Sequence, residues 1–293
     1  MKKLIISKDI KKLIRQELKT DIGKADITTL ALIPKGKKIR AAIVVKKDGV
    51  IAGLDIARAV FTLQNKNIKF KANVKDGSYV KVEKNRPYEK IAFIEGSARD
   101  ILMAERTALN ILSHLSGVAT LTRAFVDKVR PYKAKITDTR KTTLLLRDLE
   151  KYAVRVAGGY NHRLGLYDQV LIKGNHIKVA GISPARCVKL AKKKTSKIVE
   201  VELKKVADFD KTIKASPDII MLDNMKLSDI KKALKKKEKY ASLNKGKKLP
   251  KIEVSGNICL DNVRKVAALG VDFISVGALT HSNPSLDMAL KSE

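Results

Sequence analysis

The segment IVEVELKKVADFDKTIKASPDIIMLDN, residues 198–224, contains the pattern that decides the fold. It begins with a short β-branched run, continues with apolar residues at helical spacing, and ends in a second apolar run. This order is typical of a strand, a helix and a second strand that lies parallel to the first. The same alternation continues outward in both directions. The sequence therefore predicts a parallel sheet with helices packed against it.

Six strands are predicted in this part of the chain, with helices between them. The predicted strands are 134–136, 169–172, 198–203, 218–222, 251–254 and 273–276, and the predicted helices are 142–156, 184–192, 206–214, 227–236 and 260–269. Six such units in series indicate a barrel-like sheet. The first third of the chain reads as a separate mixed α/β unit, with a hairpin formed by 39–46 and 50–54 and a long helix over 98–115.

The composition is strongly basic. The 293 residues include 62 Lys and Arg against 30 Asp and Glu, a net charge of +32, with 44% hydrophobic residues. That hydrophobic content can form a core, which excludes wholesale disorder. The charge leaves nucleic-acid binding open, but aromatic residues are only 4% and the lysines are spread along the chain, which disfavours a base-stacking surface. We favour a lysine-coated protein whose positive potential attracts small anions.

Neither the cysteines nor the apolar segments indicate a secreted or membrane protein. Cys187 and Cys259 cannot form a disulfide framework or a paired-cysteine metal motif. The basic N-terminus is followed by too few apolar residues for a secretory signal. No stretch approaches the roughly 18 apolar residues that a membrane helix needs. We therefore expect a cytoplasmic protein with no membrane-spanning part.

Each predicted barrel strand ends in residues that can do chemistry. In a barrel of alternating strands and helices, the C-terminal ends of the strands form one rim, and this rim carries the active site. Residues far apart in sequence are therefore expected to converge there, which indicates an enzyme. The candidates at the strand ends are Thr139, Arg140, Lys141, Lys173, Glu202, Asp223, Ser255, Gly256, Asn257, Val276, Gly277 and Ala278.

Acidic residues gather on one strand face. Glu200 and Glu202 point the same way because side chains alternate along a strand. Two inward carboxylates are costly unless cations or a metal balance them, and Lys141 and Lys173 are candidate partners. Glu202 and Asp223 offer the oxygen ligands that Mg²⁺ prefers. Alternatively, Glu200 and Glu202 lie on a solvated edge strand, and Asp223 only caps the following helix.

Cations are densest between residues 140 and 176. Arg140, Lys141, His162, Arg163, Lys173 and His176 lie in this range and indicate a substrate with several negative charges. The small residues at 255–257 and 276–278 favour an anion site, because free backbone N–H groups at such turns bind phosphate. Zinc is poorly supported, since no paired-histidine spacing occurs. The two remaining histidines, His114 and His281, are interpreted as structural.

Eight motifs in this order resemble the quinolinate phosphoribosyltransferase family, also called carboxylating nicotinate-nucleotide pyrophosphorylase. They are DIGKADITT, ERTALNILSHLSGVAT, TDTRKTT, GGYNHRLGLYDQVLIKGNH, EVEL, IIMLDN, EVSGN and DFISVGALTHS, which together run from residue 21 to residue 282. The long fourth motif is highly specific. The chain departs from the family pattern at Leu144-Leu145, where Pro-Gly is usual, and at Gly174, where Asp is usual.

The resemblance implies an N-terminal α/β sandwich domain and an open six-stranded α/β barrel. We place the first domain at residues 1–115, packed with residues 280–293, and the barrel at residues 116–279. The resemblance also implies a pentosyltransferase that transfers the phosphoribosyl group of phosphoribosyl pyrophosphate to quinolinate. Decarboxylation then gives nicotinate mononucleotide, pyrophosphate and CO₂ in the de novo biosynthesis of NAD.

The resemblance also implies roles for the candidates. Thr139, Arg140, His162 and Arg163, with Lys141 and Lys173, bind quinolinate, and the small residues after the last two strands bind phosphate. Lys141, Lys173, Glu202 and Asp223 are the catalytic residues, and Glu202 and Asp223 hold the ribose hydroxyls and Mg²⁺ through water. In a homodimer, Arg106 reaches the quinolinate of the other subunit. The alternatives are a diverged paralogue similar to the molybdate-transport-associated homologues, and a basic nucleic-acid-binding protein.

Overall fold

The computed structural model describes residues 4–293, which fold into two compact units. Unit 1 comprises the chain up to Arg123, together with Asp148–Gly158 and Asn283–Glu293. Unit 2 comprises Ala124–Arg147 and Gly159–Ser282. Each unit contains a sheet of its own.

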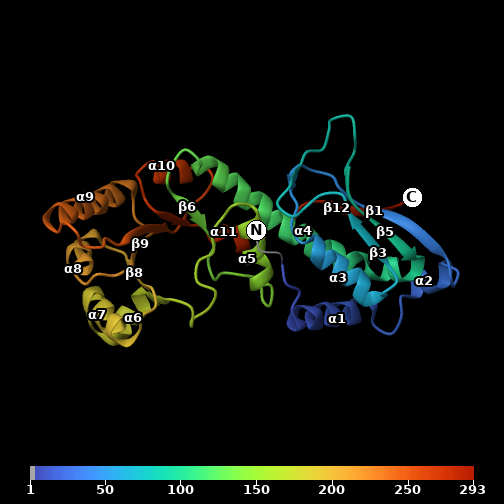
Figure 1. Ribbon diagram of the computed structural model, residues 1–293, viewed down its shortest axis with the longest axis horizontal. Helices are drawn as coiled ribbons and strands as arrows, with labels where there is room; N and C mark the ends of the chain where they lie inside the picture. The colour runs from blue at the N-terminus through green and yellow to red at the C-terminus, as the bar shows by residue number, and fades with distance from the viewer. Residues whose placement is uncertain (1–3) are drawn as a thin grey trace. The chain divides into compact units, whose positions relative to one another are not determined.

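Unit 1 is built on a four-stranded antiparallel sheet in the order β12-β1-β5-β3. The strands are β1 (Lys38–Val45), β3 (Lys69–Ala72), β5 (Glu89–Ser97) and β12 (Met288–Ser292). The residues of β1 from Ala41 onward are fully buried, which is why this strand reads as a continuous apolar run. The red strand β12 lies beside the blue strand β1 in Figure 1, although the two are far apart in sequence.

Helices and a short strand pair complete unit 1. They are α1 (Lys8–Ile22), α2 (Ile27–Leu32), α3 (Leu54–Gln64), α4 (Ala98–Val129), α5 (Arg147–Val156), β2 (Gly49–Val50) and β4 (Tyr79–Val80). The side chains of Ser7 and Asp26 accept hydrogen bonds from the first turns of α1 and α2, so both helices have ordinary N-caps. The helix α4 continues beyond Arg123 into unit 2.

Two local predictions for the first third of the chain are wrong. The segments 39–46 and 50–54 do not form a hairpin, since β1 pairs with β5 and β12, while β2 pairs with β4. The turn between them only redirects the chain, and partners from distant segments satisfy both edges of β1. The predicted helix 98–115 also ends too early, because α4 extends to Val129.

Unit 2 contains a six-stranded parallel sheet in the order β6-β11-β10-β9-β8-β7. The strands are β6 (Lys135–Thr137), β7 (Val170–Ile172), β8 (Val199–Leu203), β9 (Ile219–Asp223), β10 (Lys251–Ser255) and β11 (Phe273–Ser275). All six predicted strands are confirmed, with ends that differ by at most one residue. The end strands β6 and β7 are not neighbours in this order, so the barrel is open, as predicted.

The helices of unit 2 follow the strands. They are α6 (Gly174–Ala180), α7 (Pro184–Lys194), the 3₁₀ helix η1 (Val206–Asp208), α8 (Phe209–Ile213), α9 (Leu227–Leu243), α10 (Val263–Ala267) and α11 (Ala278–His281). The helix α7 packs against β7 and β8, and α8 packs against α7 and α9; α8 and α9 lie beside the strands β8 and β9 in Figure 1. Within residues 4–293, none of the helices combines the length and apolar character needed to cross a membrane.

Candidate active site

A cavity of about 710 Å³ opens at the C-terminal ends of the strands of unit 2. Residues from the ends of all six strands line it, as expected for a barrel of this type. The structure brings together every predicted site residue except Arg106 and Val276. Those that line the cavity are Thr139, Arg140, Lys141, His162, Arg163, Lys173, Glu202, Asp223, Ser255, Gly256, Asn257, Gly277 and Ala278.

The two exceptions lie elsewhere. The side chain of Val276 is buried, with 1% exposed, and its backbone N–H donates to the carbonyl of Thr137 at 2.9 Å. Its place is therefore in the barrel wall rather than in the cavity lining. Arg106 is an exposed residue of α4 in unit 1. Its predicted role across a dimer interface stays a prediction.

The basic wall of the cavity has two buried arginine nitrogens without partners. The Nε atoms of Arg140 and Arg163 are buried and have no hydrogen-bond partner among the described residues. Burial, and then the positive charge of Arg140, lower the pKa of Arg163. Buried donors left without acceptors are costly. This pair therefore indicates that an anionic ligand completes the site, and guanidinium groups suit carboxylates and phosphates.

The acidic wall is formed by Glu202 and Asp223, which are both partly buried. The backbone N–H of Gly174, at the start of α6, donates to Glu202 Oε1 at 3.3 Å. A carboxylate is favoured at this place because the N-terminus of a helix carries partial positive charge. The cavity is thus lined by cations and by two carboxylates, an arrangement that can bind an anion, hydroxyl groups and a divalent cation.

The turn after β10 has a tightly fixed backbone. Gly256 has φ +96°, and a Cβ atom on it would lie 2.3 Å from Asn224 Oδ1, so any other residue would be strained and would displace Asn224. Asn224 and Asn257 have φ of 54° and 52°, a region that asparagine tolerates better than most residues. Asn257 Nδ2 donates to Asn224 Oδ1 at 3.1 Å, which connects the turns after β9 and β10. Asn224 also lines the cavity.

A second close approach lies after β11. A Cβ atom on Gly277 would be 3.0 Å from His281 Nε2 and 3.5 Å from Lys141 Cδ. The hydroxyl of Thr280 donates to the carbonyl oxygen of Lys141 at 2.6 Å, so α11 holds the backbone of this lysine. His281, interpreted from the sequence as structural, lines the cavity. The only sequence signal for it was its position shortly after a strand end.

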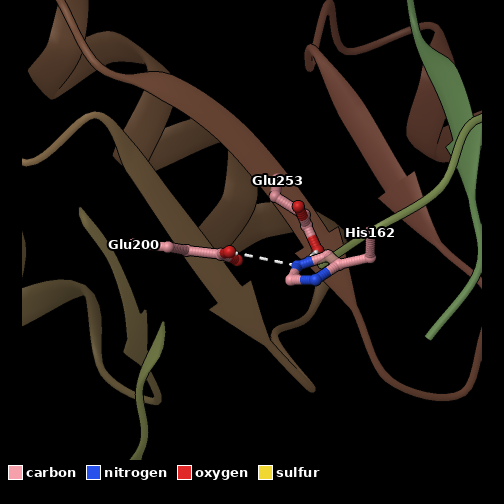
Figure 2. Close-up of side chains that lie close together, drawn as sticks. All are labelled: His162, Glu200 and Glu253. Atoms are coloured by element: carbon pink, nitrogen blue, oxygen red, sulfur yellow. Dashed lines mark ion pairs between the residues drawn. The ribbon is translucent and has the colours of Figure 1, made fainter. Parts of the chain in front are cut away.

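A buried polar cluster lies deeper in the barrel. His162 Nε2 lies 3.0 Å from Glu200 Oε2 and 3.5 Å from Glu253 Oε1, and the two carboxylates come from the separate strands β8 and β10 (Figure 2). Burial, and then the charge of Glu200, raise the pKa of Glu253 to about 8. The sequence suggested lysine partners for Glu200, but the structure gives it His162. Glu253 was not predicted, although its alternation with Ser255 along β10 carried the signal.

Comparison with known proteins points to one family. Models described as the N-terminal and C-terminal domains of quinolinate phosphoribosyl transferase match residues 26–116 and 118–291. The chain is 42% identical over 283 residues to the probable nicotinate-nucleotide pyrophosphorylase [carboxylating] of Methanocaldococcus jannaschii, covering 95% of both chains. It is 39% identical over 284 residues to the nicotinate-nucleotide pyrophosphorylase [carboxylating] of Mycobacterium leprae, covering 94% of this chain and 95% of the relative.

The fold agrees with solved structures of similarly named proteins. The structure of the nicotinate-nucleotide pyrophosphorylase from Francisella tularensis has a TM-score of 0.88 and 37% identity, covering 99% of this chain and 98% of that one. The corresponding structure from Ehrlichia chaffeensis has a TM-score of 0.86 and 35% identity, covering 99% of this chain and 100% of that one.

Proposed function

This chain belongs to the quinolinate phosphoribosyl transferase family, and from that premise we propose which residues of the barrel cavity perform its reaction. The enzyme is a pentosyltransferase that transfers the phosphoribosyl group of phosphoribosyl pyrophosphate to quinolinate. The products are nicotinate mononucleotide, pyrophosphate and CO₂, in the biosynthesis of NAD. The diverged paralogue and the nucleic-acid-binding protein, considered as alternatives from the sequence, are not favoured.

The observation that carries the assignment of the cavity is the pair of buried arginine nitrogens. Quinolinate has two adjacent carboxylates, and Arg140 and Arg163 offer two Nε–H groups that lack acceptors within the described chain. Each pairing replaces an unsatisfied buried donor by a charge-assisted hydrogen bond. Lys141 and Lys173, on the same cavity, add positive charge. A ligand with one carboxylate would leave one arginine unsatisfied, so we expect a preference for quinolinate over nicotinate.

The sugar donor occupies the rest of the cavity in this proposal. Glu202 and Asp223 accept hydrogen bonds from the ribose hydroxyls and favour the positive charge that develops at the anomeric carbon. The backbone N–H groups of 255–257 and 277–278 bind phosphate oxygens. The fixed geometry of the first of these turns, imposed by Gly256 and Asn224, supports a preorganised anion site.

Bond making and breaking then follow from position. The pyridine nitrogen of quinolinate forms a bond to the anomeric carbon as the bond to pyrophosphate breaks. The nitrogen becomes cationic, and this charge stabilises the carbanion that remains when the neighbouring carboxylate leaves as CO₂. A proton from solvent completes the product. No covalent bond to the protein is needed, so the chain acts by holding the reactants in line and balancing their charges.

We extend the proposal to Mg²⁺ as a cofactor. The donor set fits, because Glu202 and Asp223 are carboxylates on one cavity, and Mg²⁺ in proteins binds one or two carboxylates through water. When bound, the ion supplies charge neutralisation for the pyrophosphate leaving group. Removal of divalent cations by a chelator is expected to abolish turnover, and added Mg²⁺ is expected to restore it.

A homodimer with shared sites belongs to the same proposal. Arg106 is exposed on α4 and is proposed to reach the quinolinate of the partner subunit. Arg106→Ala and Lys141→Ala are each expected to be inactive. In a mixed dimer one site carries both defects and the other neither, so random exchange restores about a quarter of wild-type activity. Mixed dimers without activity contradict a role of Arg106 across the interface.

The proposed location of the enzyme is the cytoplasm, supported by Cys187 and Cys259, which are both free thiols as is usual in a reducing compartment. Cell fractionation followed by immunodetection checks it.

The central experiment measures ¹⁴CO₂ released from quinolinate labelled in the carboxyl group next to the ring nitrogen. Release is expected only when phosphoribosyl pyrophosphate is also present, with nicotinate mononucleotide formed in equal amount. Nicotinate serves as the matched substrate control, since it lacks the second carboxylate, and is expected to react poorly. Equal turnover of nicotinate contradicts the pairing of two carboxylates with two arginines.

A further inference from the structure

The barrel of unit 2 has a second cavity besides the active site, and His162 lines both. The second cavity, of about 370 Å³, is lined by residues at the beginnings of the strands, among them Ile219, Lys251 and Phe273, and also by Gln169 and Glu253. The active-site cavity lies at the other ends of the same strands. The ring of His162 therefore lies between the two cavities, in the interior of the barrel.

His162 connects the open edge of the barrel to its middle strands. It belongs to the segment that runs from Tyr160, bridged to Thr137 at the end of β6, to Gln169 before β7. Its ring contacts Glu200 on β8 and Glu253 on β10 (Figure 2). The side chains of these residues are 9%, 0% and 2% exposed, respectively. The contact is thus a buried brace across the barrel.

Hydrogen bonding fixes the protonation of this ring. The backbone N–H of Arg163 donates to His162 Nδ1 at 2.8 Å, so Nδ1 is an acceptor without a proton. The other nitrogen, Nε2, therefore carries the ring proton and faces Glu200 Oε2 at 3.0 Å. A metal-binding histidine normally donates from its second nitrogen and binds the metal with the first. This arrangement is the reverse, and it disfavours a metal held by the cluster of His162, Glu200 and Glu253.

A second connection runs from Glu200 to Arg163. Gln169 Nε2 donates to Glu200 Oε2 at 2.6 Å, and the carbonyl oxygen of Gln169 accepts a hydrogen bond from Arg163 Nη1 at 3.1 Å. Glu200 thus holds Arg163 by two routes, through the neighbouring His162 and through Gln169. Its negative charge also favours the charged form of Arg163, against the effects of burial and of Arg140. Glu200 does not line the active-site cavity.

The backbone of the same segment is held from β6. Asp138, fully buried, accepts a hydrogen bond from the backbone N–H of His162 at 2.8 Å and one from Asn161 Nδ2 at 2.5 Å. The main chain at 161–162 is therefore fixed by Asp138, while the His162 ring is fixed by Glu200 and Glu253. The Nε of Arg163, which lacks a partner among the described residues, is left for a ligand.

We propose that Glu200 and Glu253 are positioning residues that act through His162 and Gln169 to hold Arg163 where it meets a carboxylate of quinolinate. The inference rests on the proposed function of the cavity. It changes the role expected for His162, whose ring nitrogens are both engaged inside the protein. His162 is then part of the brace rather than a cation that grips the substrate.

The test compares Glu200→Gln with wild type in steady-state kinetics and in calorimetric titration with quinolinate. Glutamine keeps the shape but lacks the charge, and as an acceptor for two donors it is weaker. The KM and the Kd for quinolinate are expected to rise at least tenfold, which is about 1.4 kcal/mol, while the KM for phosphoribosyl pyrophosphate changes less than twofold. Equal increases for both substrates, or no increase for quinolinate, overturn the inference.

A matched control exists in unit 1. Glu150 is also fully buried and pairs with a histidine, His114, at 2.8 Å. Glu150→Gln removes a pair of the same kind and is expected to lower the thermal midpoint while the quinolinate KM stays within twofold. A rise of that KM equal to the rise in Glu200→Gln means that general loosening, rather than positioning, is the cause. If Glu200→Gln does not fold, Gln169→Met breaks the second route and is expected to raise the quinolinate KM severalfold.

Conservative replacement of the histidine separates a brace from other roles. His162→Gln can still donate a hydrogen bond to Glu200, so its Kd for quinolinate is expected to stay within tenfold of the wild-type value. His162→Leu cannot donate, and its Kd is expected to be at least ten times higher than that of His162→Gln. No rescue by glutamine, or Zn²⁺ bound tightly by wild type and lost in Glu253→Gln, overturns the brace. If wild type itself releases no CO₂, the proposed function fails; if it does and Glu200→Gln binds quinolinate normally, only the positioning inference fails.

Discussion

Replacing Gly256 by alanine tests whether the turn after β10 is a preorganised phosphate site. The residue has φ +96°, and a non-glycine residue in the left-handed region costs roughly 1–2 kcal/mol. The new methyl group would also lie 2.3 Å from Asn224 Oδ1, so Asn224 must move and give up its bond from Asn257 Nδ2, a loss of about 1 kcal/mol. The expected decrease in the free energy of unfolding is therefore about 2–3 kcal/mol.

Gly246 provides the matched control. Its φ is +83°, and nothing lies within 4 Å of the position of an added Cβ atom. Gly246→Ala thus incurs only the backbone cost, about 1–2 kcal/mol. Urea unfolding of the two variants measures the difference, expected to be about 1 kcal/mol. The KM for phosphoribosyl pyrophosphate is expected to rise severalfold in Gly256→Ala alone. The reasoning is refuted if the two variants have equal unfolding free energies, or if Gly256→Ala leaves the KM for phosphoribosyl pyrophosphate unchanged.

Three other predictions concern charge, pH and backbone strain. Lys141→Ala and Lys173→Ala are each expected to lower kcat/KM by about tenfold or more, because each loses a charge-assisted hydrogen bond. The surface variant Lys235→Ala is expected to keep a kcat/KM near that of wild type. Similar losses in all three variants contradict the assignment of the cavity. Burial raises the pKa of the Glu253 carboxyl from 4.5 to about 8. Between these pH values the folded protein holds a proton that the unfolded chain releases. The free energy of unfolding therefore falls as pH rises through this range. Relative to Glu253→Gln, wild type is therefore expected to be more stable at pH 5 than at pH 8 in urea unfolding, and a difference independent of pH contradicts the raised pKa. Leu145 has φ 65° and is 74% exposed, so Leu145→Gly relieves backbone strain at little loss of packing. The variant is expected to raise the unfolding free energy by up to about 1 kcal/mol. A lower thermal midpoint instead means that the leucine side chain makes stabilising contacts despite its exposure.

The parts of the fold that sequence reasoning predicted are those with local signals. The strands of unit 2 are short apolar runs separated by amphipathic helices, so their ends could be placed within one residue. The cavity followed from the same pattern, because the ends of parallel strands share one rim. The partners of β1 could not be predicted, since β12 and β5 are distant in sequence and nothing local specifies which strand pairs with which.

The chemistry of the site was less predictable than its location. Residues at strand ends were found from position alone, but the direction of a side chain in a loop was not. His162 was grouped with the arginines as a cation, whereas the structure turns its ring toward Glu200 and Glu253. Glu253 was overlooked, although its alternation with Ser255 indicated its face of the strand, because nothing local in the sequence identifies its partners.

The pairing of β1 with β12 sets an order on folding during synthesis. Val45 pairs with Met288, and Ala41 pairs with Ser292, so one edge of β1 stays unpaired on the ribosome until β12 has been translated. Apart from the pair of β6 and β11, the strands of unit 2 pair with strands much closer in sequence, which favours earlier formation of that sheet. Until β12 arrives, β1 is an open, apolar edge of the kind that recruits other chains. Chaperone binding to nascent chains is therefore expected to persist on unit 1 after unit 2 has become resistant to protease.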